Sequence, residues 1–241
     1  MDRAARGYSR RCALRVVGGA TLGVLAGCTG GSGASGDGES GNEGGSGDGE
    51  TDAPGTPIGE QLPAPVKGDA DADVTLAVFE DYACPHCADY NVEGFPELAA
   101  EYVDPGEIRY EHRDLPIPVA DPGSFQAANA ARAVQDRHGD EAFWEYAAVL
   151  FERSGEIPGG APDIFGTIAD EQGHDSEAIR AAAADRVYEG TVQADREEGV
   201  ELGVEATPSF VLDGEVVASG YGSGTVEEVS AAIEAALSET G

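Results

Sequence analysis

The feature that most constrains this chain is the segment Cys84-Pro85-His86-Cys87, in which two thiols lie three positions apart. A short apolar run over residues 74–79 precedes it, and a helix-like stretch begins at Pro85. This order predicts a dithiol at a strand-to-helix turn, where unpaired N–H groups and the helix dipole favour a thiolate. Zinc sites use the same spacing, so the motif needs support from the rest of the chain.

The other two cysteines lie at the N-terminus, where the sequence predicts an export signal over residues 1–27. Cys12 lies in a basic leader, and the apolar stretch 16–26 is shorter than the ~20 residues that span a bilayer. The leader carries Ser9-Arg10-Arg11, as in twin-arginine signals, and ends in Leu-Ala-Gly-Cys28, which resembles a lipobox. We therefore expect lipidation of Cys28 as the sole membrane anchor. The alternative is a cleaved signal with an incidental cysteine.

The segment after Cys28 is predicted to be a disordered acidic tether over residues 28–62. Residues 29–57 contain Gly, Ser, Asp and Glu but no aromatic or large aliphatic side chain. Such a segment cannot bury enough apolar surface to offset its chain entropy. Residues 63–241 are long enough for one domain with a sizeable core.

The chain is strongly acidic, with a formal net charge of −32. Without the five arginines and one aspartate of the leader, 9 basic and 45 acidic residues remain, a formal charge of −36. This charge excludes nucleic acid as a partner. The acids are spread along the chain and Lys67 is the only lysine, which favours adaptation to high salt over one acidic docking face. The composition is typical of an extreme halophile.

Hydrophobic periodicity and turn signals predict the elements of the domain. We expect a buried strand over 74–79, a helix over 85–103 interrupted at Pro96, and a strand over 108–112. A proline-rich loop over 115–122 leads to helices over 123–138, 141–153, 163–172 and 175–199. Strands over 209–212 and 215–218 flank the hairpin signal Asp213-Gly214, and an amphipathic helix covers 226–237.

Without its helical block, this order is β-α-β-β-β-α, the arrangement of the thioredoxin fold. The run Phe-Glu-Asp-Tyr-Ala-Cys-Pro-His-Cys at 79–87, the later Thr207-Pro208 and the inserted helices together resemble the DsbA-like thiol–disulfide oxidoreductases. The resemblance covers residues 72–237. It implies an α/β thioredoxin fold with a helical domain inserted between the second and third strands, at about 120–200.

The placement of the thiols predicts their roles. Cys84, at the helix start, should be the nucleophile, and Cys87, one turn further in, the buried resolving thiol, the two forming a redox-active disulfide. His86 is expected to stabilise the thiolate; the alternative is an exposed helix-start residue. The resemblance implies that Pro208 is cis and faces the dithiol, so that the backbone of Thr207 pairs with substrate. An ordinary trans-proline at a strand entry is the alternative.

One position departs from the resembled family. Members often carry a buried acid six residues before the first cysteine, where this chain has Val78. Glu80 shares a strand face with Val78 and is the best substitute for handling the proton of Cys87. His112 and Arg113, at the end of the second strand, are expected at the surface; the alternative is that they line the groove.

These observations favour an extracytoplasmic, lipid-anchored, monomeric oxidoreductase that donates disulfides to exported proteins through Cys84 and Cys87 and needs no cofactor or metal. Its partners would be the thiols of exported proteins or peptides and a membrane redox partner that re-oxidises it. A thiol reductase of the same fold stays open, whereas an isomerase would usually dimerise through an extra domain. A copper or zinc chaperone using Cys84, Cys87 and a histidine, or a redox-silent binding lipoprotein, would belong to other functional classes.

Overall fold

The computed structural model describes residues 61–159 and 162–240. The predicted signal, Cys28 and the tether up to residue 60 lie outside these residues. At the end of the predicted tether, the backbone N–H of Leu62 donates to the hydroxyl of Thr191 (3.1 Å). Within the described part of the chain, no helix is long and apolar enough to cross a membrane.

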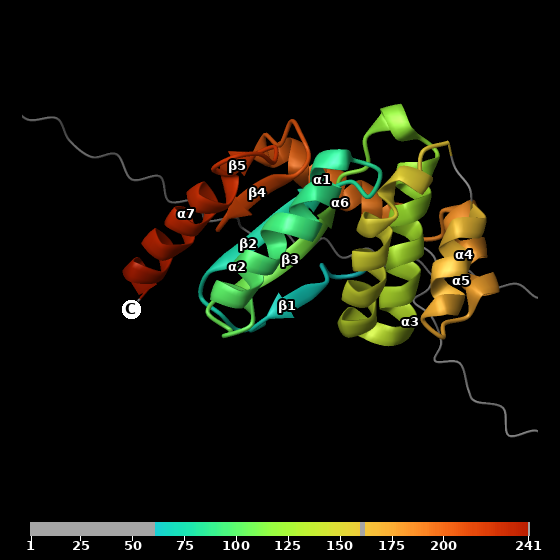
Figure 1. Cartoon of the computed structure of the whole chain (residues 1–241), viewed down its shortest axis with the longest axis horizontal. Helices are drawn as coiled ribbons and strands as arrows, with labels where there is room; N and C mark the ends of the chain where they lie inside the picture. The colour runs from blue at the N-terminus through green and yellow to red at the C-terminus, as the bar shows by residue number, and fades with distance from the viewer. Residues whose placement is uncertain (1–60, 160–161, 241) are drawn as a thin grey trace, which may run out of the picture. The chain divides into compact units, whose positions relative to one another are not determined.

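The described residues form one five-stranded sheet in the order β1-β3-β2-β4-β5 (Figure 1). Its strands are β1 (Val66–Gly68), β2 (Thr75–Glu80), β3 (Arg109–Asp114), β4 (Ser209–Leu212) and β5 (Glu215–Ser219). β2 pairs in parallel with β3, and the other three pairings are antiparallel. β1 was not predicted, because three residues that include a lysine and a glycine carry no alternation signal.

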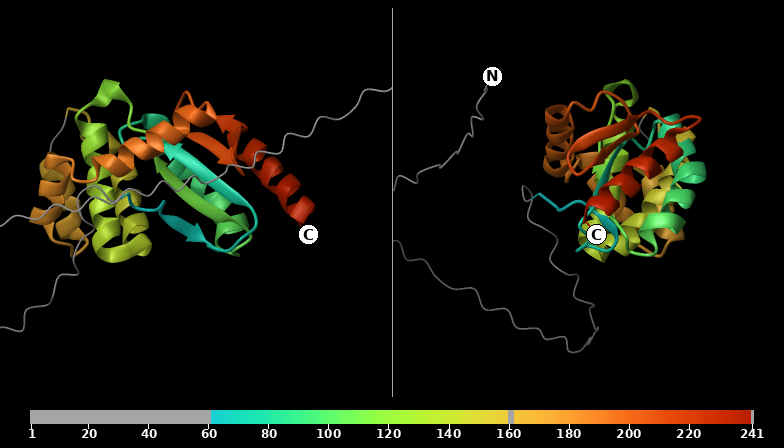
Figure 2. Two further views of the ribbon diagram at one scale, coloured as in Figure 1. Left: turned by 180° about the vertical axis from the view of Figure 1, so that it is seen from behind. Right: turned by 90° about the vertical axis from the view of Figure 1, so that its left-hand side faces the viewer.

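Alternation along β2 divides the core of the sheet between its two faces. Leu76 and Val78 pack on one face with α2 (Phe95–Leu98), its flanking π-helical segments and α7 (Thr225–Thr240). Ala77 and Phe79 pack on the other face, against the end of α6. Seen from behind, α6 crosses the face opposite to α1 and α2 (Figure 2, left).

The helix after the dithiol is interrupted near Pro96, as predicted. It consists of α1 (Pro85–Asp89), a π-helical segment over Tyr90–Gly94, α2 (Phe95–Leu98) and a second π-helical segment over Ala99–Val103. The first widened segment ends two residues before Pro96, whose nitrogen has no hydrogen to donate to the regular helical ladder. This helix still presents buried Tyr90, Leu98 and Tyr102 to the sheet.

The predicted helical insertion lies between β3 and β4. α3 (Gly123–Glu152) joins the two helices predicted over 123–138 and 141–153, and it reverses direction at Gly139, where φ is 84°. Figure 1 shows its two halves side by side. α4 (Pro162–Glu171) matches the next predicted helix. The shared core of this insertion also contains Cys84 and Cys87, so the dithiol lies where the insertion meets the sheet.

The prediction of a single helix over residues 175–199 is wrong. The structure has α5 (Ser176–Asp185) and α6 (Glu189–Leu202), separated at Arg186, which adopts a left-handed φ of 50°. The Arg186 guanidinium pairs with Asp121 and lies 4.6 Å from the ring centroid of Phe125. These tertiary contacts end a helix that the local sequence would continue.

The C-terminal hairpin and helix follow the prediction. Asp213 and Gly214 have φ values of 48° and 88°, as a two-residue type I′ turn between β4 and β5 requires. The Asp213 carboxylate accepts the backbone N–H of Thr75 (2.9 Å), which ties this turn to β2. α7 (Thr225–Thr240) buries Val226, Val229 and Ile233 at helical spacing.

A buried ionic cluster joins the insertion to the sheet. The guanidinium of Arg132 in α3 is fully buried and donates to Asp114 of β3 (Nε–Oδ2 2.6 Å) and to Asp195 of α6 (Nη2–Oδ2 2.6 Å). It also donates to the carbonyl of Pro63 (3.2 Å) and the side chain of Gln135 (2.9 Å). Removal of this cation would take away the counter-ion that lies nearest to both buried carboxylates.

We therefore predict that Arg132→Leu lowers the free energy of unfolding by about 3–5 kcal/mol. The matched control is Arg153→Leu, whose partners Glu156 and Glu171 are exposed. That change should cost at most about 1 kcal/mol. Urea unfolding in high salt measures both values, and equal losses for the two variants would contradict this role of the buried cluster.

Candidate active site

The structure places the two thiols where β2 leads into α1. Cys84 is the residue before the helix, with an extended backbone (φ −81°, ψ 121°), and Pro85 is the first helical residue. The carbonyl of Cys84 accepts the backbone N–H of Cys87 (3.1 Å). Both cysteines are free thiols; Cys84 is 6% exposed and Cys87 is fully buried. Cys84 is thus the more accessible sulfur, as the sequence predicted.

The turn that presents Cys84 is held by Asp81. Its carboxylate accepts the backbone N–H of Ala83 (Oδ1, 2.8 Å) and of Ile117 in the loop after β3 (Oδ2, 2.7 Å). Its carbonyl accepts the backbone N–H of Cys84 (3.0 Å). Burial raises the pKa of Asp81, and these backbone bonds oppose the rise. Asp81 therefore fixes the dithiol turn against the loop over residues 115–122.

The Thr207–Pro208 peptide bond is cis, which confirms the prediction. It also faces the dithiol, since Cys84 Sγ lies 3.5 Å from the carbonyl oxygen of Thr207. Two segments 123 residues apart in the sequence thus meet at the reactive sulfur. The conformation of Pro208 and its position opposite Cys84 agree with the resemblance stated above.

Hydrogen bonds lower the pKa of Cys84 from 9.0 to about 5. The largest contribution is a hydrogen bond from the Cys87 thiol. Burial opposes it, while the side chain of Thr207 and the backbone N–H groups of Cys87 and His86 add to it. Near neutral pH, Cys84 is therefore a thiolate.

Cys87 has the opposite character. Burial raises its pKa well above 9.0, and the neighbouring Cys84 and the charge of Glu80 raise it further. The pair therefore holds one proton, and that proton resides on Cys87. Any reaction that makes Cys87 a nucleophile or a leaving group must move a proton inside the protein.

Glu80 lies inward beside the dithiol, on the face that alternation predicted. Asn91 donates both to Glu80 Oε1 (2.6 Å) and to the carbonyl of Cys87 (3.0 Å), so it links the acid to the resolving cysteine. Burial raises the pKa of Glu80 above its usual value, and the contacts with His112 and Asn91 offset only part of this rise. Asn91 was not predicted from the sequence, since a single asparagine one turn beyond Cys87 belongs to no motif.

The expected surface position of His112 is wrong: its side chain is fully buried. The parallel register places His112 beside Val78, and Asp114 beside Glu80, on the same face of the sheet. His112 Nδ1 lies 3.2 Å from Glu80 Oε2, and its Nε2 lies 3.2 Å from Asp114 Oδ1. Arg113 points to the other face, where it is partly buried and pairs with Glu111 and Asp195.

His86 is exposed at the helix start. Its backbone N–H is one of the donors that lower the pKa of Cys84. Its side chain lines a pocket of about 490 Å³ together with Asp89, Glu93 and Tyr221. A role of the imidazole in stabilising the thiolate stays a prediction.

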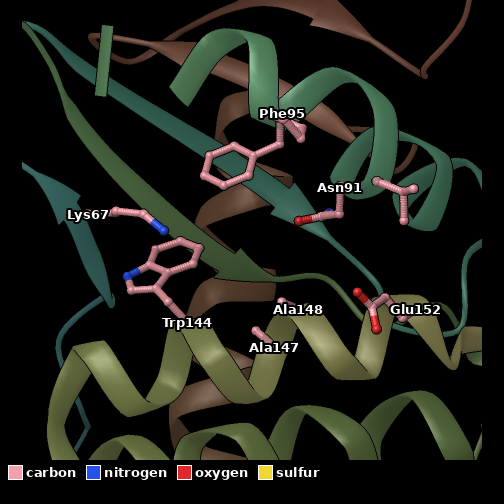
Figure 3. A pocket seen from close by; sticks show the side chains of 9 residues that line it. Lys67, Asn91, Phe95, Trp144, Ala147, Ala148 and Glu152 are labelled. Carbon is pink, nitrogen blue, oxygen red and sulfur yellow. The ribbon is translucent and has the colours of Figure 1, made fainter. Parts of the chain in front are cut away.

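A second pocket, of about 260 Å³, lies between the helix after the dithiol and α3 (Figure 3). Lys67 lies over the rings of Phe95 (5.6 Å) and Trp144 (5.9 Å) in its wall. Asn91 also lines it, so the pocket comes within one side chain of Glu80. Among residues 61–159 and 162–240, no three His, Cys, Asp or Glu side chains gather as a metal site.

Comparisons with known proteins agree with this geometry. Residues 61–235 match the thioredoxin family. Disulfide bond formation protein D of Bacillus subtilis is 26% identical over 156 residues, which cover 64% of this chain and 69% of that protein. The crystal structure of oxidised BdbD from Bacillus subtilis superposes with a TM-score of 0.65 at 25% identity, over 73% of this chain and 93% of that chain.

A Na⁺/H⁺ antiporter, NhaA 1 of Salinispora arenicola, is 32% identical over 177 residues. The match covers 73% of this chain but 25% of the antiporter, so the chain spans about a quarter of that relative. The family match covers most of the domain and includes the dithiol and Pro208. The chain therefore belongs to the thioredoxin family.

Proposed function

We propose that this chain is a thiol–disulfide oxidoreductase that donates disulfides to exported proteins through Cys84 and Cys87. The observation that carries the proposal is the asymmetry of the pair, because the pKa of Cys84 is lowered to about 5 and that of Cys87 is raised. A stable Cys84 thiolate stabilises the reduced enzyme, which makes the disulfide a strong oxidant. The similarity to disulfide bond formation protein D supports the same direction.

In the proposed reaction, a client thiolate attacks Cys84 Sγ of the enzyme disulfide. The Cys84–Cys87 bond breaks, Cys87 leaves as a thiolate and takes up a proton, and a mixed disulfide joins Cys84 to the client. A second client thiolate then attacks the client sulfur, and Cys84 leaves as the stabilised thiolate. Two electrons pass from the client to the enzyme. Glu80 is the proposed residue that exchanges a proton with Cys87, and the backbone of Thr207 beside cis-Pro208 is the proposed docking edge for the client.

The proposed location is outside the cell membrane, with Cys28 as the lipid anchor and the segment after it as a tether. Export and lipidation rest on the leader sequence alone. Since each turnover leaves the enzyme reduced, the proposal requires a membrane redox partner that restores the disulfide. We further propose that the enzyme is monomeric and adapted to high salt.

The first prediction of this proposal concerns the Cys84 thiolate. The 240 nm absorbance of the reduced protein should titrate at about pH 5 and disappear in Cys84→Ala. Cys87→Ala should keep the absorbance but raise the pKa of Cys84, because the largest stabilising hydrogen bond is lost. An unchanged pKa in Cys87→Ala would contradict this origin of the acidity.

The second prediction separates the roles of the two thiols. Cys84→Ser should abolish disulfide exchange with a reduced model client, whereas Cys87→Ser should accumulate a mixed disulfide at Cys84. Non-reducing electrophoresis and mass spectrometry measure the adduct. If the adduct instead accumulated in Cys84→Ser, the assigned order of attack would be reversed.

The third prediction is the reduction potential of the pair, measured by equilibration with glutathione in high salt. We expect a value of ~−120 mV, well above the ~−270 mV of thioredoxin.

The thiolate stabilises the reduced form most above the pKa of the unfolded thiol and loses this effect as pH falls through about 5. The stability advantage of the reduced over the oxidised protein should therefore shrink towards pH 5. A potential near the lower value would favour a reductase.

A further inference from the structure

We propose that His112 is a positioning residue for proton transfer at Cys87: as an imidazolium held between Glu80 and Asp114, it keeps the Glu80 carboxyl in the ionised form that accepts the Cys87 proton. The inference rests on the proposed function, because it concerns the proton that the dithiol exchanges. It assigns a role to a histidine whose side chain is fully buried and reaches Glu80, the residue proposed to handle that proton.

The charge of His112 follows from what its two ring nitrogens face. Nδ1 lies 3.2 Å from Glu80 Oε2, and Nε2 lies 3.2 Å from Asp114 Oδ1. Asp114 is ionised, because the buried guanidinium of Arg132 donates to its other oxygen at 2.6 Å. Nε2 must then carry a hydrogen, and an ionised Glu80 requires a hydrogen on Nδ1 as well. The ring is therefore an imidazolium whenever Glu80 is ionised.

The surroundings of His112 favour this charged form. On its own strand it faces Asp114, and from β2 and the following turn it faces Glu80 and the hydroxyl of Tyr82 (3.2 Å). α3 contributes aromatic rings at 5.4–6.4 Å, those of Phe143, Trp144 and Phe151. Burial lowers the pKa of His112, but Asp114 and Glu80 together raise it to about 9.

The pairing of charges in the buried cluster indicates a function for His112. Glu80, Asp114 and Asp195 are buried carboxyls, and the fully buried cation Arg132 contacts only the latter two. Glu80 thus depends on His112 for its counter-ion, while Asn91 supplies a neutral hydrogen bond. Without the imidazolium, burial would hold Glu80 protonated to higher pH, where it cannot accept a further proton.

The step affected is the closure of a mixed disulfide by Cys87. The Cys87 thiol gives its proton to Glu80, its sulfur bonds to Cys84 Sγ, and the bond from Cys84 to the departing thiol breaks. One disulfide forms and one is lost, and the departing thiolate takes a proton from solvent. In disulfide donation the same proton returns from Glu80 to Cys87.

The test uses reduced protein and saturating glutathione disulfide, so that closure of the Cys84–glutathione adduct is unimolecular. Acid quenching and mass spectrometry follow the adduct across pH. In His112→Gln the pH midpoint of closure should move up by about 1–3 units, which slows closure about tenfold or more below the wild-type midpoint. His112→Lys keeps a cation beside Glu80 and should retain the low midpoint.

Tyr82→Phe is the matched control, because it removes the hydroxyl on Nε2 and leaves the charges in place. Its midpoint should equal that of the wild type. The 240 nm titration of Cys84 should stay at about pH 5 in each variant, which places the effect on Cys87. A wild-type profile in His112→Gln, or equal shifts in His112→Gln and His112→Lys, would overturn the proposal.

A measurement on the wild-type protein decides the matter even if these variants fail to fold. Nitrogen-15 shifts of the four histidines should show His112 as an imidazolium near neutral pH, with deprotonation at about pH 9. A neutral His112 ring near pH 7 would contradict the proposal. If instead the wild-type thiols never form the disulfide, the proposed function fails, and the histidine spectrum still reports on His112 independently.

Discussion

The site depends on one constraint, the burial of charged groups on the face of the sheet that also supports the dithiol. Strand alternation and the parallel register of β2 with β3 place Glu80, His112 and Asp114 on the same face. Buried charges are tolerated only when their partners are complete, so Arg132 of α3 and Asp195 of α6 must lie against them. The insertion is therefore held in place by the same charges that surround the resolving thiol.

This arrangement explains why the two cysteines differ so strongly although they are one helical turn apart. Cys84 lies at the edge of the insertion, where hydrogen-bond donors of the helix start and the Thr207 side chain reach its sulfur. Cys87 lies behind it among apolar side chains and near the Glu80 charge, both of which oppose ionisation. The fold thus separates one sulfur that stabilises a negative charge from one that must exchange a proton.

The sequence predicted most of the sheet, the inserted helices, the dithiol turn and the cis-proline, because each has a local signal or a quoted motif. It missed β1, whose three residues depend on pairing with β3, and it missed the break at Arg186, which depends on contacts with Phe125 and Asp121. His112 was misplaced for a similar reason. A histidine near a strand end is buried here only because α3 packs over it. No local sequence pattern predicts that packing.

The distribution of cations connects the acidic composition to the site. Residues 28–241 contain only nine Lys and Arg residues. Two of these, Arg132 and Arg113, form ion pairs with carboxylates of the buried cluster. Salt at high concentration screens carboxylates on the surface but reaches buried ones far less. In concentrated salt, a chain with this charge can therefore leave its surface carboxylates without ion pairs. Its buried carboxylates still need basic side chains beside them. His112 is a third internal cation and has the same role of balancing buried carboxylates.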